Sequence, residues 1–315
     1  MKFLSKVGIL VIGAIICGLF IFATQNPSTI STPSKISNYN TPVEEGVLKV
    51  YALPYLEYID FAGEVVPLND TDVRERLDRE LHVNIYWQSN MLLMMKKANR
   101  FFAEIEPLLE KYGLPDDFKY LAVAESGLDN VRSHAGASGF WQFMKGTGKE
   151  YGLEINEYVD ERYNLELATK VAADYLNKSK ARFGSWTTAA AAYNAGNSGV
   201  NKQLERQDAK GYYSLLLNSE TSRYVFRILA FKEIMSNPKK YGFYLNPGDL
   251  YQPIPTKTLI VNTPVEDFAI FAKDNGINYK ILKIHNPWLR DTYLRNASGK
   301  EYEIKIPLPG YYVTE

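Results

Sequence analysis

Residues 115–144 read PDDFKYLAVAESGLDNVRSHAGASGFWQFM, and this stretch decides the fold and the site that the sequence predicts. Pro115 suits the first position of a helix, and the two aspartates that follow it suit the positively polarised first turn. Gly127 supplies a stop signal. The pattern therefore predicts a short helix with Glu125 in its last turn.

Glu125 falls on the apolar face of this helix, because Phe118, Leu121 and Ala122 stand at helical spacing from it. Burial and the negative end of the helix dipole both disfavour the ionised carboxylate, so we expect its pKa to be raised. A general acid that works near neutral pH needs such a shift. A glutamate near a helix end is more often a solvated surface charge, so its sequence context has to decide.

The residues that follow favour a sugar site. Gly136 and Gly139 bracket a flexible turn, and Phe140, Trp141 and Gln142 come directly after it. Aromatic faces stack on the C–H faces of sugar rings, and a side-chain amide can bond to hydroxyl and acetamide groups. We therefore expect this segment to line a carbohydrate site beside Glu125.

Composition narrows the class of protein. The chain has 315 residues, a formal net charge of zero, 46% hydrophobic and 13% aromatic residues, so it is globular and large enough for one or two cores. The charge balance offers no basic field, and nucleic acid is not expected as a partner. One Cys and three His argue against a disulfide framework and a dedicated metal site.

The first 23 residues predict an export segment. Lys2 and Lys6 precede an uncharged apolar run, residues 7–23, which is about long enough to cross a bilayer. We interpret it as an uncleaved signal anchor that places the rest of the chain in the periplasm, with a cleaved signal as the alternative. Residues 24–46 are rich in Ser, Thr, Pro and Asn and read as a linker.

Helical periodicity dominates the middle of the chain. After an extended lead-in with a turn at residues 60–63, helices are expected at 71–87, 91–112, 165–183, 186–194 and 219–235. Tyr193 and Asn194 come at a helix end beside a glycine turn, where side chains can face a cleft. Glu220 is at a helix start, where an acid commonly serves the helix dipole.

The last part of the chain has a different pattern. After residues 246–248, short apolar runs and turns predict the order strand, helix, helix, strand. Thr263 and Glu266 form a candidate capping box with Pro264 at the first helical position.

These motifs, taken in order, resemble the lytic transglycosylases of glycoside hydrolase family 23, over about residues 61–235. They are Glu125-Ser126, Gly139-Phe140-Trp141-Gln142, Ala192-Tyr193-Asn194-Ala195-Gly196, and Glu220-Thr221 with Tyr224-Val225. The resemblance implies a mainly α protein with a lysozyme-like helical domain. It also implies that Glu125 is the only catalytic acid/base and that the substrate is bound by Ser126, Ser133, Gly139, Phe140, Trp141, Gln142, Tyr193, Asn194, Glu220 and Tyr224.

The C-terminal pattern resembles a degenerate LysM module, a small α+β unit that binds peptidoglycan. Its usual Gly-Asp-Thr opening is replaced by Asn262-Thr263-Pro264, so a plain packing appendage is the alternative. The expected domains are an anchor (1–23), a linker (24–46), a transglycosylase domain (47–247, catalytic core about 90–236) and the LysM-like module (248–315).

The resemblance predicts a cell-envelope enzyme that cleaves the MurNAc–GlcNAc β-1,4 bond of peptidoglycan glycan strands. With one carboxylate, the product would be a 1,6-anhydro-MurNAc end, whereas ordinary glycosidases use two carboxylates. A lysozyme-type hydrolase and a non-catalytic peptidoglycan-binding protein remain alternatives. A monomer without metal or cofactor is expected.

Overall fold

The computed structural model describes residues 51–313, and from Ala52 onward the chain forms one compact unit. The predicted anchor and linker, residues 1–46, lie outside the described residues. Within residues 51–313, no helix is both long and apolar enough to cross a membrane.

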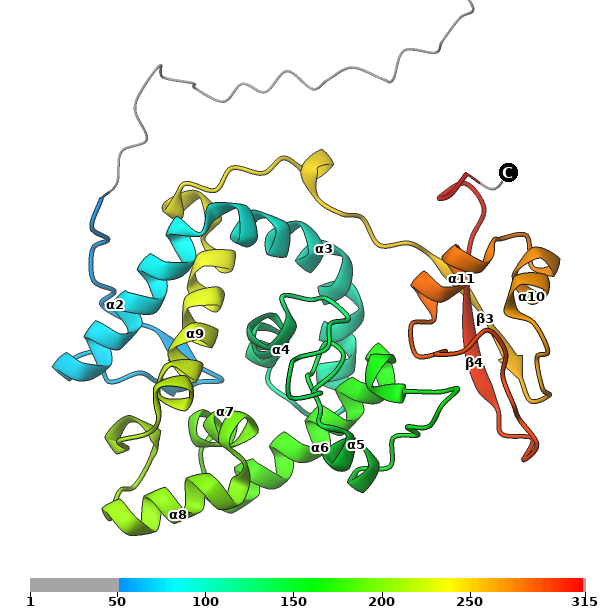
Figure 1. Cartoon of the computed structure of the whole chain (residues 1–315). Helices are drawn as coiled ribbons and strands as arrows, with labels where there is room; N and C mark the ends of the chain where they lie inside the picture. Colours follow the sequence, from blue (N-terminus) through cyan, green and yellow to red (C-terminus); the bar gives the residue numbers. More distant parts are fainter. Residues whose placement is uncertain (1–50, 314–315) are drawn as a thin grey trace, which may run out of the picture. The chain divides into compact units, whose positions relative to one another are not determined.

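Most of the unit is helical, as predicted (Figure 1). A short hairpin comes first, with β1 (Asp60–Phe61) paired antiparallel to β2 (Glu64–Val65). The helices that follow it are α2 (Thr71–Tyr86), α3 (Gln88–Lys111), α4 (Lys119–Ser126), α5 (Lys145–Glu150), α6 (Leu165–Phe183), α7 (Trp186–Ala195), α8 (Asn197–Gln207) and α9 (Ser219–Ser236).

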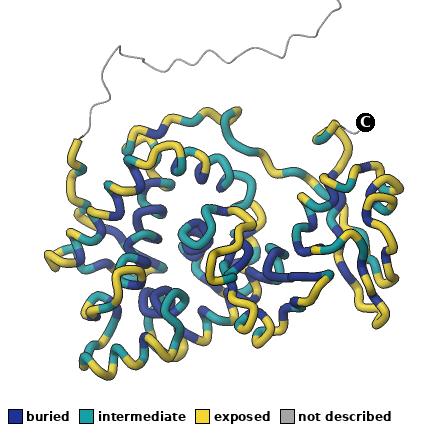
Figure 2. The backbone as a smooth tube through the Cα atoms, in the orientation of Figure 1, coloured by how far each residue is buried: buried dark blue, intermediate teal, exposed yellow. Residues whose placement is uncertain are grey.

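Helix α4 lies in the middle of this helical part, with α3 and α9 packed against it (Figure 1). It is preceded by a 3-10 turn, η1 (Asp116–Phe118), and Gly127 ends it in the left-handed conformation with φ of 60°. The expected helix is therefore present, with a 3-10 first turn after Pro115. Phe118 and Leu121 are fully buried, and Figure 2 shows that buried backbone gathers around this position.

Two of the observed helices were not predicted. α8 has the sequence NSGVNKQLERQ, and its apolar face consists of Val200 and the partly buried Leu204, which is too short a pattern to predict a helix. α5 is six residues long and contains two glycines.

The C-terminal part has the expected order of strand, helix, helix, strand. β3 (Thr256–Val261) pairs antiparallel with β4 (Tyr302–Pro307), from Thr256 opposite Pro307 to Val261 opposite Tyr302. The two helices between them are α10 (Phe268–Asp274) and α11 (Tyr279–His285).

The capping box expected at Thr263 was wrong. The backbone of Val265 exchanges two hydrogen bonds with Leu294, at 3.0 and 2.8 Å, and this holds the segment after Pro264 extended. α10 begins at Phe268 instead, and the Asp267 side chain accepts hydrogen bonds from the first backbone N–H groups of that helix.

The helical part and the C-terminal part each have a large hydrophobic core, and a small third cluster lies around Val200 on α8. The core of the helical part runs from Ile59 to Phe243. The core of the C-terminal part includes Val159 and Tyr163, which come from the loop before α6. Residues of the predicted transglycosylase domain therefore belong to the core of the LysM-like part.

Candidate active site

Glu125 stands in the last turn of α4 and is only partly exposed. Its carboxylate accepts a hydrogen bond from the hydroxyl of Tyr224, which is buried on α9. Burial raises the pKa of Glu125 to about 7, although the Tyr224 hydrogen bond and the positive charge of Arg227 both lower it. The direction is the one predicted from the sequence, and a carboxyl group with this pKa can both give and take a proton near neutral pH.

Tyr193 is the second phenol near this carboxyl group. Its hydroxyl donates to the carbonyl of Trp141 at 2.7 Å, and its ring packs edge-on against Phe143. Burial, together with the nearby charge of Glu125, raises the pKa of Tyr193 well above its usual range. The phenol therefore stays neutral, and the structure places Tyr193 and Tyr224, two residues that the family resemblance implies for the site, close to Glu125.

Asn194 has a different place in the site. Its amide oxygen accepts a hydrogen bond from the Thr221 hydroxyl at 2.9 Å. Since Asn194 lies at the end of α7 and Thr221 in the first turn of α9, this bond joins the two helix ends that flank the acid.

The loop of residues 131–143 follows α4 and folds back on itself. Ser133 accepts a hydrogen bond from the backbone N–H of Ala137 at 3.0 Å. The Gln142 side-chain amide donates to the carbonyls of Val131 and Gly139 at 3.1 and 2.8 Å. These bonds fix the loop internally, so both polar side chains shape its backbone.

Three residues of the same loop have a positive φ angle. Gly136 has φ of 88°, Gly139 has φ of 83° and Gln142 has φ of 49°. The last of these is uncommon for a residue with a side chain, and such outliers persist only where the surrounding structure holds them. Ser126, just before the loop, uses its hydroxyl for a 3.2 Å bond to the carbonyl of Ala122 in the preceding turn.

Phe140 and Trp141 do not offer ring faces to a ligand in this structure. Their exposed fractions are 3% and 0%, Phe140 packs edge-on against Phe101, and the Trp141 indole donates to Thr169 at 2.9 Å. The expectation that these two rings stack on a sugar therefore does not fit their position. Both rings are buried in the core, where a large aromatic side chain is stabilised by its contacts, and from there they anchor the loop.

The other acidic candidates have cationic partners. Asp129, just past the end of α4, is exposed and lies 2.6 Å from the ammonium of Lys97. Glu220 is exposed in the first turn of α9 and pairs with Arg227 at 3.1 Å. Neither carboxylate is as buried as Glu125, and neither has its environment of neutral phenols.

A buried cluster of charged side chains on α2 and α9 was not predicted from the sequence. Glu80 on α2 is 1% exposed and pairs with Arg79, Arg223 and Arg227. Its position was detectable, because it shares a helical face with Val73 and Leu77. Arg227 thus links this buried acid to Glu220 and to the electrostatics of Glu125.

A cavity of about 470 Å³ opens between α3, the loop and the C-terminal part, and Asn130, Phe140, Tyr163 and Trp288 are among its lining residues. Glu125 is not one of them. Within residues 51–313, no group of three or more His, Cys, Asp or Glu is arranged to hold a metal ion.

Two family models match the chain. Residues 104–216 match the transglycosylase SLT domain, and residues 257–310 match the soluble lytic transglycosylase C-terminal LysM-like domain.

Curated relatives include the membrane-bound lytic murein transglycosylase D of Escherichia coli strain K12, which is 31% identical over 248 residues. That match covers 77% of this chain and 53% of the relative, so the chain spans about half the length of the protein it matches. A putative tributyltin chloride resistance protein of Alteromonas sp. strain M-1 is 28% identical over 122 residues, which is 38% of this chain and 59% of the relative.

Among solved structures, an inactive mutant of the lytic transglycosylase Slt from Pseudomonas aeruginosa aligns with a TM-score of 0.36 and 22% identity. The alignment covers 48% of this chain and 26% of that one.

Proposed function

Because the chain carries a transglycosylase SLT domain followed by a LysM-like domain of the lytic transglycosylase type, we propose that it is a peptidoglycan lytic transglycosylase. The substrate is the glycan strand, and the bond cleaved is the MurNAc–GlcNAc β-1,4 linkage. The observation that supports this proposal best is Glu125, a partly buried carboxyl group with a pKa near 7 and a neutral phenol bound to it.

Glu125 is the acid that protonates the leaving glycosidic oxygen. A carboxyl group with a pKa of about 7 is substantially protonated at neutral pH, whereas one at its usual value of 4.5 is almost fully ionised. Tyr224 holds the carboxylate in one orientation through its hydroxyl. Since its pKa is also raised well above the usual range by burial, Tyr224 remains a donor throughout.

The same carboxylate then acts as base. After the leaving oxygen has taken the proton of Glu125, the carboxylate removes a proton from the 6-hydroxyl of the muramyl sugar, and that oxygen closes on the anomeric carbon. The C–O bond to the leaving sugar breaks as the internal C–O bond forms, so no water is consumed and the product is a 1,6-anhydro-MurNAc end. An internal nucleophile is present at high effective concentration, which replaces a second carboxylate.

The environments of Asp129 and Glu220 favour this one-acid scheme. A retaining or inverting hydrolase needs a second carboxylate as nucleophile or base. Asp129 and Glu220 are each exposed and paired with a cation, whereas a nucleophile or base needs its carboxylate oxygens free to face the substrate.

The substrate-binding residues of the proposal are those around the acid. The loop with Ser133, Gly139 and Gln142 forms one wall, and Tyr193 with Asn194 forms the other. Ser126 supports the turn that carries Glu125. Glu220 and Tyr224 shape the side of the site that α9 forms, and Phe140 and Trp141 act by anchoring the loop.

We further propose that the protein works in the cell envelope, held to the membrane by its N-terminal segment, as a monomer.

Product analysis tests the function. Purified full-length protein in detergent is incubated with murein, and the released fragments are separated and weighed by mass spectrometry. The expected products carry 1,6-anhydro ends and are lighter by one water than hydrolysis products. Reducing MurNAc ends would identify a hydrolase of the lysozyme type, and binding to murein without any released fragment would identify a non-catalytic binding protein.

A further inference from the structure

Arg162 holds the 131–143 loop through hydrogen bonds to its backbone. It is 6% exposed, and one guanidinium nitrogen donates to the carbonyls of Gly136 and Phe143 at 2.9 and 3.0 Å. The other side of the guanidinium forms a two-point pair with Asp160, at 2.9 and 2.7 Å. A planar fork of this kind holds direction as well as charge, so Arg162 fixes both ends of the turn that contains Ser138 and Gly139.

The loop also touches this segment directly. A Cβ atom placed on Gly139 would lie 1.9 Å from the carbonyl oxygen of Arg162. Glycine is therefore required at this position both for its positive φ and for the close backbone approach.

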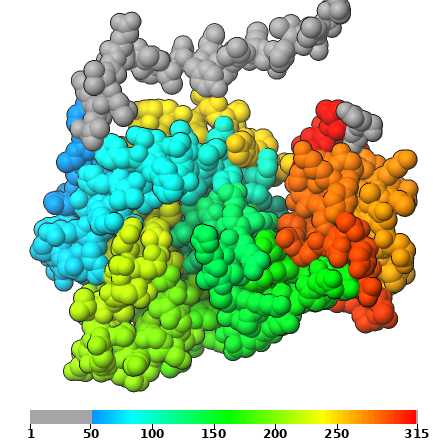
Figure 3. Space-filling view, in the orientation of Figure 1, coloured from blue at the N-terminus to red at the C-terminus, as the bar shows by residue number. Residues whose placement is uncertain are grey.

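Asp160 belongs to a small hairpin, residues 154–161, that is paired with the C-terminal part. The hairpin closes through a bridge between Ile155 and Asp160. On its other edge, the Asp160 backbone N–H donates to the backbone carbonyl of Trp288 at 2.9 Å. The Arg290 backbone N–H donates to the backbone carbonyl of Tyr158 at 2.7 Å. Figure 3 shows this green segment reaching the orange and red C-terminal residues.

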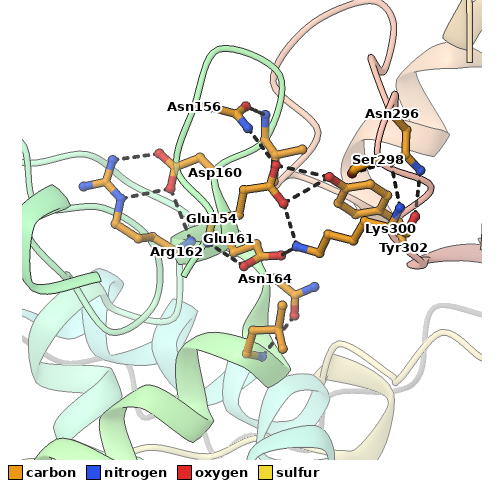
Figure 4. A network of polar contacts seen from close by, with 12 residues as sticks. Glu154, Asn156, Asp160, Glu161, Arg162, Asn164, Asn296, Ser298, Lys300 and Tyr302 are labelled. Atoms are coloured by element: carbon orange, nitrogen blue, oxygen red, sulfur yellow. Dashed lines mark hydrogen bonds and ion pairs between the residues drawn. The ribbon is translucent and has the colours of Figure 1, made fainter. Parts of the chain in front are cut away.

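A cluster of side chains strengthens the same junction (Figure 4). The ammonium of Lys300 lies 2.6 Å from Glu154 and 2.8 Å from Glu161, and the Tyr302 hydroxyl donates to Glu154 at 3.0 Å. Although burial opposes it, the hydrogen bonds from Lys300 and Tyr302 lower the pKa of Glu154, so it is a charged partner at neutral pH. Glu161 also accepts the backbone N–H of Glu154, which closes the hairpin.

From this chain of contacts we propose that the C-terminal LysM-like part positions the 131–143 loop of the active site, with Arg162 as the positioning residue between them. The proposal rests on the function proposed above, since it assigns the loop to substrate binding. A detachable glycan-binding module would be joined by a flexible linker, but here the C-terminal part pairs with the hairpin through its backbone and shares Val159 and Tyr163 in its core.

The two lysines of the C-terminal part that reach the helical part allow a matched test. Lys300 contacts the hairpin, whereas Lys305 pairs with Glu104 on α3 at 2.9 Å and has no contact with the hairpin or the loop among its hydrogen bonds. Their side chains are 42% and 39% exposed, so a methionine is tolerated at either position. Lys300→Met removes two ion pairs at the hairpin and therefore loosens it. Lys305→Met removes one ion pair elsewhere, from a lysine of similar exposure.

Steady-state kinetics on glycan strands give the first readout. We expect Lys300→Met to raise KM by about threefold to tenfold with little change in kcat, because a loosened loop loses binding that ground state and transition state share. Lys305→Met should leave both parameters within about twofold of the unaltered protein. The acidity of Glu125 depends on α4 and α9, so the pH profile of kcat should stay in place in both variants.

Amide hydrogen exchange gives a second readout that needs no activity. The N–H groups of Ser138 and Gly139 bond to Phe143 and Val131 within the loop, and they should exchange several-fold faster in Lys300→Met but not in Lys305→Met. Lys300→Arg keeps the charge and should restore both readouts. Arg162→Lys, which keeps the charge beside Asp160 but cannot fork to both carbonyls, should show the same loosening as Lys300→Met.

Equal behaviour of Lys300→Met and Lys305→Met in kinetics and in exchange would overturn the positioning role. A rise in KM in Lys300→Met with unchanged exchange in the loop would also overturn it, because binding would then be lost by another route. If the unaltered protein makes no anhydro product, the proposed function fails, and loop exchange alone still decides whether the C-terminal part positions the loop.

Discussion

Two glutamates, Glu64 and Glu125, lie at opposite ends of two helices, and their pKa values are shifted in opposite directions. Glu64 lies at the N-terminus of α7, where its carboxylate accepts the backbone N–H groups of Trp186 and Thr187 at 2.6 and 2.9 Å. It also accepts the Ser185 hydroxyl and the Lys180 ammonium, at 2.7 and 2.8 Å. Burial alone would raise its pKa, but these hydrogen bonds lower it to about 2.

Glu125 lies at the C-terminal end of α4, where the helix dipole is negative. Its hydrogen-bond donor is one phenol, and burial raises its pKa to about 7. The comparison shows that the helix end and the number of donors decide the role of a buried carboxylate. Glu64 is a helix cap that is charged at neutral pH, whereas Glu125 can exchange a proton there.

The largest expected effect is the loss of catalytic turnover in the variant Glu125→Gln. The amide keeps the shape and the hydrogen-bonding reach of the side chain but has no transferable proton, so turnover should fall by roughly two to four orders of magnitude. Binding of glycan strands should be largely kept. Rates of anhydro-product release and a separate binding measurement on murein check both parts.

Glu64→Gln is the matched control for that variant, because it makes the same chemical change at the other helix end. Turnover per folded molecule should remain close to that of the unaltered protein. Equal loss in the two variants would mean that the activity reports folding and not the acid.

The second expected effect is on stability and concerns Glu64. Its folded-state pKa is lowered from 4.5 to about 2, so its stabilisation is present above pH 4.5 and is lost as the pH falls towards 2. After allowance for solvent screening of a partly exposed group, Glu64→Gln should cost roughly 1–2 kcal/mol of unfolding free energy at pH 7. Denaturant unfolding at pH 7 and at pH 3 measures it, and the difference from the unaltered protein should shrink at the lower pH.

Glu125→Gln should have the opposite sign. The pKa of Glu125 is raised from 4.5 to about 7, so the folded state loses stability through this group as the pH rises from 4.5 through 7. At pH 8 the variant should be more stable than the unaltered protein by roughly 1–3 kcal/mol. A variant that is less stable at pH 8 would show that the buried carboxylate is not a strained group.

The position of Glu125 in the last turn of α4 could be predicted from the sequence because the signals that fix it are local. Pro115, Gly127 and the spacing of Phe118 and Leu121 fix the helix and the face of Glu125 without knowledge of the rest of the chain. The partner Tyr224 lies 99 residues away, and only the resemblance of motif order placed it in the site.

What the sequence could not supply depends on distant packing. In the sequence, Glu64 looks like a surface residue in a hairpin. Its role as a helix cap depends on α7, which lies more than 120 residues further along the chain. Trp141 reads as a stacking platform, since its sequence neighbours do not show that Thr169 lies in the core to receive its indole N–H. The pairing of the C-terminal part with residues 154–161 is likewise long-range.

A smaller effect is expected from Glu220→Gln. The negative charge of Glu220 raises the pKa of Glu125, so removal of that charge should lower this pKa. The pH at which activity falls on the alkaline side should then move downward, while the products keep anhydro ends. pH–rate profiles measure this shift, and Glu166→Gln, which breaks an exposed pair with Lys111, serves as the control with no shift.

If Glu220→Gln instead abolishes activity at every pH, Glu220 is a second catalytic carboxylate. The site would then be of the paired type that hydrolases use. Retained activity with a shifted profile keeps Glu220 in the role of an electrostatic neighbour.

The smallest expected effect comes from Asp129→Asn, and it tests whether nearness in sequence to the acid means a share in the chemistry. Asp129 is 53% exposed in its side chain and pairs with Lys97 at 2.6 Å. Such exposed pairs contribute about 0–1 kcal/mol, so turnover on glycan strands should stay within about threefold of the unaltered protein. Since an asparagine cannot act as a nucleophile or a base, a loss comparable to that of Glu125→Gln would establish a second carboxylate and refute the single-acid mechanism. Lys97→Met removes the same ion pair but leaves the carboxylate, so activity that survives there and disappears in Asp129→Asn would assign the chemistry to Asp129 itself.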